Sequence, residues 1–99
     1  MTRLLTEEEI DRQLEGLGPW RHDEGEPAIT ATFEFTDFAA ALDFVTLVGH
    51  EAEQMNHHPD IDIRWNRVTL TLSTHSAGGL TQLDIELAHR ISTAAGLDF

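Results

Sequence analysis

The chain has 99 residues, which predicts a single domain spanning residues 1–99. It contains no cysteine, so disulfides and thiolate metal sites are excluded, and its net charge of −12 disfavours direct binding to nucleic acid or to an anionic membrane. No apolar run reaches the length expected of a signal peptide or a transmembrane helix. We therefore expect a cytoplasmic domain that binds a neutral or cationic small molecule, or another protein.

The first third of the sequence predicts a helix followed by two strands. Residues 6–9, Thr-Glu-Glu-Glu, have the pattern of a capping box, and the apolar residues after them predict a short helix that ends near Gly16 or Gly18. Residues 19–22 are expected to begin a strand. Strict alternation of apolar and polar residues over residues 29–35 predicts a second, half-buried strand.

Two more helices are predicted further along the chain. Apolar residues recur at three- and four-residue steps over about residues 37–56, with Thr36 as the expected N-cap, and Pro59 prevents this helix from continuing. Residues 81–84 resemble a second capping box, so a last helix is expected to run from there to Gly96.

A hairpin is predicted between these two helices. Residues 60–65 and 68–73 both alternate, and Asn66-Arg67 is the candidate turn between them. The predicted order is therefore α-β-β-α-β-β-α. Short turns between consecutive strands imply antiparallel pairing, so we expect an α+β fold in which a four-stranded antiparallel sheet has three helices packed on one face.

The residues that suggest chemistry gather in one third of the chain. They are Glu53, His57, His58, Pro59, Trp65, His75 and Asp84. Imidazole is the side chain best suited to moving protons near neutral pH, and it is also a common metal ligand. The candidate chemistry is therefore proton transfer or metal binding.

Each of these residues also has a purely structural explanation. Glu53 fits a solvated helix face, Asp84 fits the third position of a capping box, and an indole in a strand is often a core residue. A zinc site built from His57, His75 and a carboxylate is the chemical rival. Neighbouring side chains such as those of His57 and His58 diverge, and no HExxH spacing is present, so zinc is the less favoured alternative.

The spacing Glu-x3-His-His-Pro-x5-aromatic-x9-His-x8-Asp resembles the signature of the pterin-4a-carbinolamine dehydratases. The similarity extends to Trp20 and to residues 33–38 and 70–75, and it covers nearly the whole chain. Many animal members have a cysteine where this chain has Ala77, and often a basic residue where it has Leu83. Neither position belongs to the core spacing.

The resemblance implies an activity, a reaction without a cofactor and an oligomeric state. It implies dehydration of a 4a-hydroxytetrahydropterin to quinonoid dihydropterin, a step in tetrahydropterin recycling, without a metal or other cofactor. It also implies a homodimer or homotetramer. Because animal members act as transcriptional coactivators, a non-enzymatic protein-binding or assembly module is the alternative.

We assign roles to the signature residues as hypotheses. His57 and His75 are the expected acid and base, in an order that the sequence leaves open, and His58 assists them. Glu53 lies four residues before His57, so it is expected to share a helix face with that ring and fix it. His22, His50 and His89 are interpreted as surface residues. The expected pterin-binding residues are Glu53, Pro59, Trp65, Thr74 and Asp84.

Overall fold

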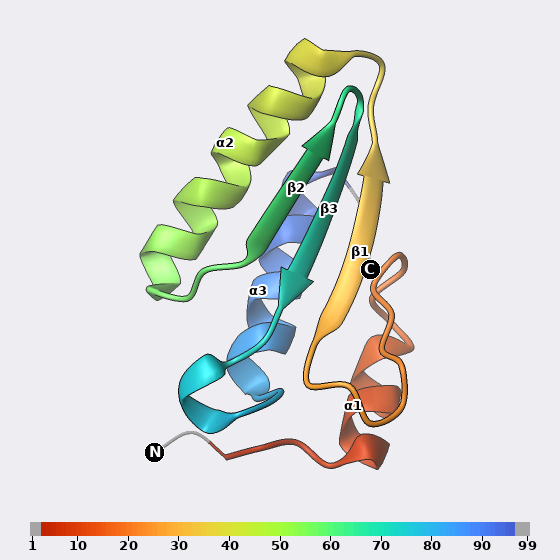
Figure 1. Cartoon of the computed structure of the whole chain (residues 1–99), viewed down its shortest axis with the longest axis vertical. Coiled ribbons are helices and arrows are strands. Elements are labelled where there is room, and N and C mark those ends of the chain that lie inside the picture. The colour runs from red at the N-terminus through yellow and green to blue at the C-terminus, as the bar shows by residue number, and fades with distance from the viewer. Residues whose placement is uncertain (1–2, 97–99) are drawn as a thin grey trace.

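The computed structural model describes residues 3–96. It contains three α-helices, three strands and one 3-10 turn, arranged as Figure 1 shows. In chain order these are α1 (Glu7–Leu14), β1 (Ile29–Glu34), α2 (Phe38–Met55), β2 (Asp60–Arg64), β3 (Arg67–Leu72), η1 (His75–Ala77) and α3 (Gln82–Ala94). Among the described residues, no helix combines the length and the apolar content that crossing a membrane requires.

The sheet has three strands in the order β1-β3-β2, and both pairings are antiparallel. The α+β class is as expected, but the four-stranded sheet is wrong. The expected first strand is reduced to one residue, Arg21, whose backbone exchanges hydrogen bonds of 2.8 and 2.9 Å with Thr30. Pro19 lacks an N–H to extend this pairing, and on the other side the chain turns away, with the Glu26 amide donating to the Asp23 carbonyl.

Helices α2 and α3 cover one face of the sheet (Figure 1). Alternate residues of the two longer strands are buried against them: Ile29, Ala31 and Phe33 of β1, and Val68, Leu70 and Leu72 of β3. The residues between them form the open face, where the hydroxyls of Thr32 and Thr69 lie 3.0 Å apart. The core is therefore one-sided, and side chains of the open face are available to solvent.

Both ends of α2 are set by single polar residues. Its N-cap is Asp37 rather than the expected Thr36, since the Asp37 carboxylate accepts a 2.8 Å hydrogen bond from the Ala40 amide. Its C-cap, Asn56, is left-handed, with φ 49°, so the chain changes direction immediately before His57. This change of direction decides where the two neighbouring histidines point.

The β2–β3 turn consists of Trp65 and Asn66, one residue earlier than expected. Asn66 is held in the turn because its side-chain amide donates to the Phe35 carbonyl at 2.8 Å, while its own carbonyl accepts from the Phe35 amide. Trp65 therefore leaves the strand, adopts a positive φ of 50°, and exposes 68 % of its surface.

The capping box that opens α1 also binds an arginine. The Glu9 carboxylate accepts two hydrogen bonds from Arg3, at 2.9 and 2.8 Å, and one from the Thr6 amide at 2.9 Å. The Arg3 hydrogen bonds, followed by that from Thr6, lower the pKa of Glu9 from 4.5 to about 2.

The lowered Glu9 pKa predicts a pH-dependent stabilisation. A carboxyl group whose pKa is lower in the folded state stabilises fully above its unfolded pKa and loses this effect as the pH falls from 4.5 to about 2. Glu9→Gln should therefore lower the melting temperature at neutral pH and have much less effect near pH 2. Thermal unfolding measured across pH tests this, with Glu8→Gln as the control. An equal drop in melting temperature at neutral pH and near pH 2 would contradict the predicted role of Glu9.

Candidate active site

A buried imidazole–carboxylate pair lies where the loop after α2 meets the start of α3. Nε2 of His57 is 2.6 Å from Oδ1 of Asp84. The Asp84 side chain is fully buried, and the His57 side chain keeps 10 % of its surface exposed. The backbone amide of His57 also donates to the Ala52 carbonyl at 3.0 Å, which ties the loop to the end of α2.

The second oxygen of Asp84 accepts hydrogen bonds from two threonines. Oδ2 accepts from the Thr74 hydroxyl at 2.8 Å and from the Thr81 backbone amide at 3.0 Å. The two threonine hydroxyls are themselves 2.7 Å apart, and Thr81 is the N-cap of α3. Asp84 therefore completes the expected capping box and also binds His57.

The second histidine belongs to a different, exposed pair. Nε2 of His58 is hydrogen-bonded to Oε2 of Glu53, with 55 % and 77 % of the two side chains exposed. The expectation that Glu53 fixes His57 is wrong. Because α2 ends at Met55 and Asn56 is left-handed, His57 does not continue the helix face of Glu53.

The remaining signature residues lie at the two ends of the hairpin. His75 is exposed and begins η1, next to Thr74, so it lies at the same end of the sheet as the buried pair. Pro59 directly precedes β2 at that end. Trp65 lies at the opposite end of β2, about 17 Å away for five strand residues. The fold therefore places the three signature histidines at one end of the sheet and Trp65 at the other.

Comparisons with known proteins identify relatives of the chain. A family model described as pterin 4 alpha carbinolamine dehydratase matches residues 3–94. The chain belongs to this family. A Nocardia farcinica relative is 49 % identical over 94 residues, covering 95 % of this chain and 97 % of the relative. A Nostoc punctiforme relative is 48 % identical over 92 residues, covering 93 % and 97 %. Both carry a provisional pterin-4-alpha-carbinolamine dehydratase name.

Two solved structures of this family or near it are similar to the chain. One is the transcriptional coactivator/pterin dehydratase from Brucella melitensis, with a TM-score of 0.90, 40 % identity, and coverage of 95 % of this chain and all of that one. The other is a pterin dehydratase-like protein identified as a RuBisCO assembly factor in the alpha-carboxysome. It has a TM-score of 0.68 and 25 % identity, and the match covers 80 % and 92 % of the two chains.

Two features of this pterin dehydratase family member were missed by sequence reasoning. His22, interpreted as a surface residue, has only 1 % of its side chain exposed; Nε2 contacts the Glu26 carbonyl, and Nδ1 lies 3.5 Å from Glu7 without a hydrogen bond. The interpretation was wrong because the loop before β1 folds back onto α1. By contrast, His50 and His89 are exposed, as expected.

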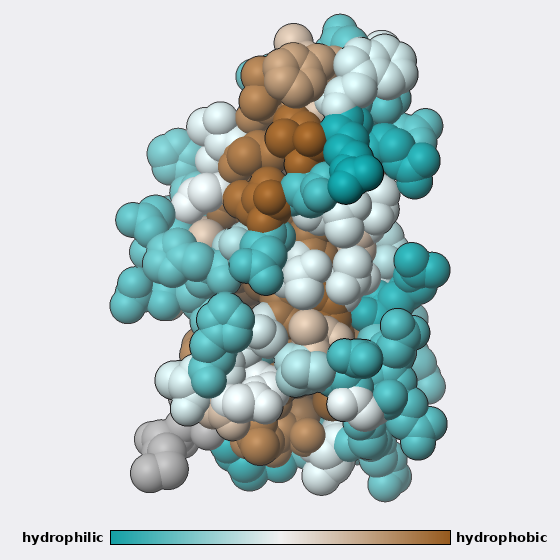
Figure 2. Space-filling model, in the orientation of Figure 1, coloured by the Kyte–Doolittle hydropathy of each residue, from teal (hydrophilic) through white to brown (hydrophobic). Residues whose placement is uncertain are grey.

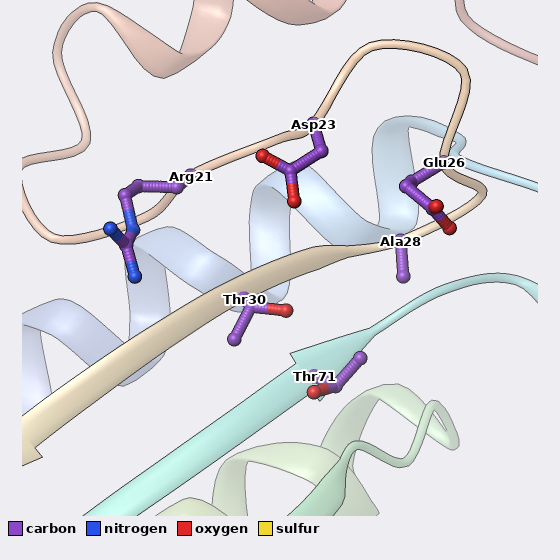
Figure 3. A pocket seen from close by; sticks show the side chains of 6 residues that line it. All are labelled: Arg21, Asp23, Glu26, Ala28, Thr30 and Thr71. Carbon is purple, nitrogen blue, oxygen red and sulfur yellow. The ribbon is translucent and has the colours of Figure 1, made fainter.

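The second feature is a hollow of about 410 Å³ on the open face of the sheet. Figure 3 shows Asp23 and Glu26 of the loop before β1 above Thr30 and Thr71 of the strands. Its lining does not include the signature histidines. Alternation along β1 and β3 places Thr30 and Thr71 on the open face, but the loop that completes the hollow has no periodic pattern from which to predict it.

The burial difference between the two histidine pairs predicts different losses of stability. His57→Ala leaves the Asp84 carboxylate buried without its imidazole partner and should lower the free energy of unfolding by about 3 kcal/mol. His58→Ala removes an exposed pair and should cost less than about 1 kcal/mol. Denaturant unfolding of both variants measures this. Equal free energies of unfolding would show that the buried pair makes no special contribution.

Proposed function

We propose that the protein is a 4a-hydroxytetrahydropterin dehydratase that acts in tetrahydropterin recycling in the cytoplasm. The observation that carries the proposal is the buried His57–Asp84 pair, which lies at the same end of the sheet as the exposed imidazoles of His58 and His75. A family model that spans residues 3–94 supports the substrate class.

The proposed reaction needs two proton transfers. The bond between C4a and the hydroxyl breaks, the departing oxygen gains a proton and leaves as water, and N5 loses its proton to form the quinonoid double bond. Hydroxide is a poor leaving group, so a positioned acid accelerates its departure, and a base accepts the N5 proton. Imidazole titrates near neutral pH and suits both steps, each worth about 10²–10⁴-fold.

We assign these transfers to His57 and His75, with His58 assisting. Glu53 is exposed beside His58 and can accept hydrogen bonds from the N–H groups of the pterin pyrimidine ring. Pro59 holds the chain at the entrance to β2. Thr74 and Asp84 are buried and bonded to each other, so their contribution to pterin binding is through the His57 ring.

The proposal predicts which histidines the reaction needs. His57→Ala and His75→Ala should each lower the dehydration rate at least about tenfold, because each removes one acid or base. His50→Ala, a change to an exposed histidine on α2 outside the proposed site, should leave the rate unchanged. The measurement is the dehydration of 4a-hydroxytetrahydropterin by purified protein. An unchanged rate in His57→Ala would remove that ring from the mechanism.

The same assay separates the rival functions. Within residues 3–96, no three imidazole or carboxylate side chains are grouped in a way that holds a metal ion. Full activity after exhaustive chelation would exclude zinc chemistry, whereas loss of activity that zinc restores would support it. The RuBisCO assembly factor with the same fold makes an assembly module the second candidate. A folded protein with no acceleration over buffer would favour that candidate.

We further propose that the protein forms a homodimer, or a homotetramer built from two dimers, through β2. This strand has only one neighbour in the sheet, β3. Figure 2 shows apolar surface over the adjoining parts of α2 and β2. The first turns of α2, the strand β2 and the turn after it carry four exposed apolar residues: Phe38, Leu42, Ile61 and Trp65. An unpaired strand edge beside such a surface is commonly covered by a second chain.

The charges at the two ends of β2 favour one register for this pairing, which also places the two Asp62 side chains opposite each other. In an antiparallel pair centred on Asp62, Asp60 of each copy lies opposite Arg64 of the other. Trp65 then extends past the end of the strand toward the second copy. This placement would let Trp65, distant from the histidines of its own chain, approach those of the other.

A charge exchange tests the proposed pairing. Asp60→Arg and Arg64→Asp should each weaken the oligomer, because each puts like charges opposite each other, and the double variant should restore it. Light scattering over a range of protein concentrations measures the oligomeric state. Leu4→Asp, which changes an exposed leucine outside β2 and α2, is the control. A monomeric native protein, or a double variant as weakly associated as the single ones, would contradict the pairing.

A further inference from the structure

We propose that Thr74 and Thr81 are positioning residues that act through Asp84 to fix the tautomer of His57, so that Nδ1 is the nitrogen this ring presents to the substrate. The role toward substrate rests on the proposed function. The tautomer itself follows from the hydrogen bonds around Asp84 alone.

The direction of the threonine hydrogen bonds is determined by their partners. Thr81 Oγ1 accepts from the Leu83 backbone amide at 3.3 Å, and Thr74 Oγ1 donates to Asp84 Oδ2. A hydroxyl has one proton to donate. Since the proton of Thr74 is used on Asp84, the 2.7 Å bond between the hydroxyls is donated by Thr81. The chain of donation therefore runs from Thr81 through Thr74 to Asp84.

These donors occupy one oxygen of the Asp84 carboxylate and leave the other for His57. Oδ2 accepts the Thr74 hydroxyl and the Thr81 backbone amide, which leaves Oδ1 facing His57 at 2.6 Å. A carboxylate only accepts, so Nε2 of His57 carries the proton that joins them. A neutral imidazole has one N–H, and Nδ1 of His57 is therefore the unprotonated nitrogen.

Nδ1 of His57 is also the nitrogen that is available. It makes no hydrogen bond within residues 3–96. Unlike Nδ1 of His22, which is fully buried without a partner, Nδ1 of His57 is accessible to solvent. The ring keeps 10 % of its surface exposed. The same nitrogen can accept a proton from N5 when the ring is neutral, or donate one to the leaving hydroxyl when the ring is charged.

His58 lacks this kind of support. Its carboxylate partner, Glu53, is 77 % exposed, and its contact with His58 is the one hydrogen bond described for its side chain. Water can replace this contact at little free-energy cost. The geometry thus distinguishes the two neighbouring histidines: His57 has a fixed tautomer and orientation, and His58 has an adjustable ring.

Asp84→Asn provides the sharpest test. An amide has one accepting side and one donating side. The Thr74 hydroxyl and the Thr81 amide still donate, so they hold the amide oxygen, and the NH₂ group faces His57. Nε2 must then accept, and the ring changes to the Nδ1–H tautomer. A triad aspartate replaced by asparagine has this effect in serine proteases.

The tautomer is read by nitrogen-15 NMR of histidine-labelled protein without substrate. We expect Nε2–H for His57 in the native protein, Nδ1–H in Asp84→Asn, and a dehydration rate at least about 10²-fold lower in that variant. Asp37→Asn, the same change at the N-cap of α2, should alter neither the tautomer nor the rate. An Nδ1–H native ring, or Nε2–H in Asp84→Asn, would overturn the inference.

A second set of variants keeps Asp84 charged. Thr74→Val removes the hydroxyl that donates to Asp84 at nearly constant side-chain volume and should lower kcat about tenfold. Thr74→Ser keeps a hydroxyl and should keep the native kcat. Thr69→Val is the matched control, because it makes the same replacement and removes the hydrogen bond between the Thr69 and Thr32 hydroxyls on the open face of the sheet. If Thr74→Val behaved like Thr69→Val, Thr74 would have no positioning role.

The two readouts separate this inference from the proposed function. A native protein that has the Nε2–H tautomer but does not dehydrate the carbinolamine would leave the tautomer assignment standing and remove the dehydratase. A protein that dehydrates the carbinolamine with an Nδ1–H ring would keep the dehydratase and remove the assignment.

Discussion

The Asp84 carboxylate has no exposed surface, and removing a charge from water costs several kcal/mol unless donors replace the water. Here the donors come from three separate parts of the chain: His57 after α2, Thr74 after β3, and the backbone of Thr81 at the start of α3. The carboxylate is stable in the core only when these three segments meet. The site therefore depends on the same contacts that close this end of the fold.

The burial of one carboxylate also explains why the two histidines differ although they are neighbours. The left-handed Asn56 turns the chain so that His57 enters the core and His58 remains at the surface. Each ring then meets a different carboxylate. A single helix-ending residue thus separates a buried imidazole from an exposed one.

Much of the fold could be predicted because its signals are periodic. The structure contains the predicted alternation of buried residues in β1 and β3 and the apolar stripe along α2. It also contains both predicted capping boxes. What could not be predicted depends on contacts between distant residues. Arg21 pairs with only one residue, the Asn66 amide moves the hairpin turn by bonding Phe35, and His22 is buried by a loop that folds onto α1.

The candidate site shows the same limit. Spacing indicated a set of candidate residues, but Glu53 and His57 were paired on the assumption that the helix continued, and the helix ends at Met55. The His57–Asp84 contact joins residues 27 apart in sequence, and no local pattern indicates it. Trp65, placed in a strand by alternation, lies instead in a turn because tertiary hydrogen bonds determine where the hairpin reverses.

Similar proteins are described as a coactivator and dehydratase in one case and as an assembly factor in another. In this chain the polar network around Asp84 is buried, whereas the large exposed apolar residues other than Leu4 lie on α2, on β2 and in the turn after β2. These two regions share few side chains. One scaffold can therefore change its surface contacts without disturbing its buried polar groups, and the reverse also holds.

Thr81 lies outside the spacing that identifies the family, and by its position it is an ordinary helix cap. Its hydroxyl is nevertheless bonded to Thr74, and its amide to Asp84. If the first turn of α3 frays, the carboxylate loses donors before the protein unfolds as a whole. Warming should therefore disorganise the buried histidine ahead of the global transition. Selection for a well-ordered His57 would then act on the end of a helix, at a residue that is itself fully buried.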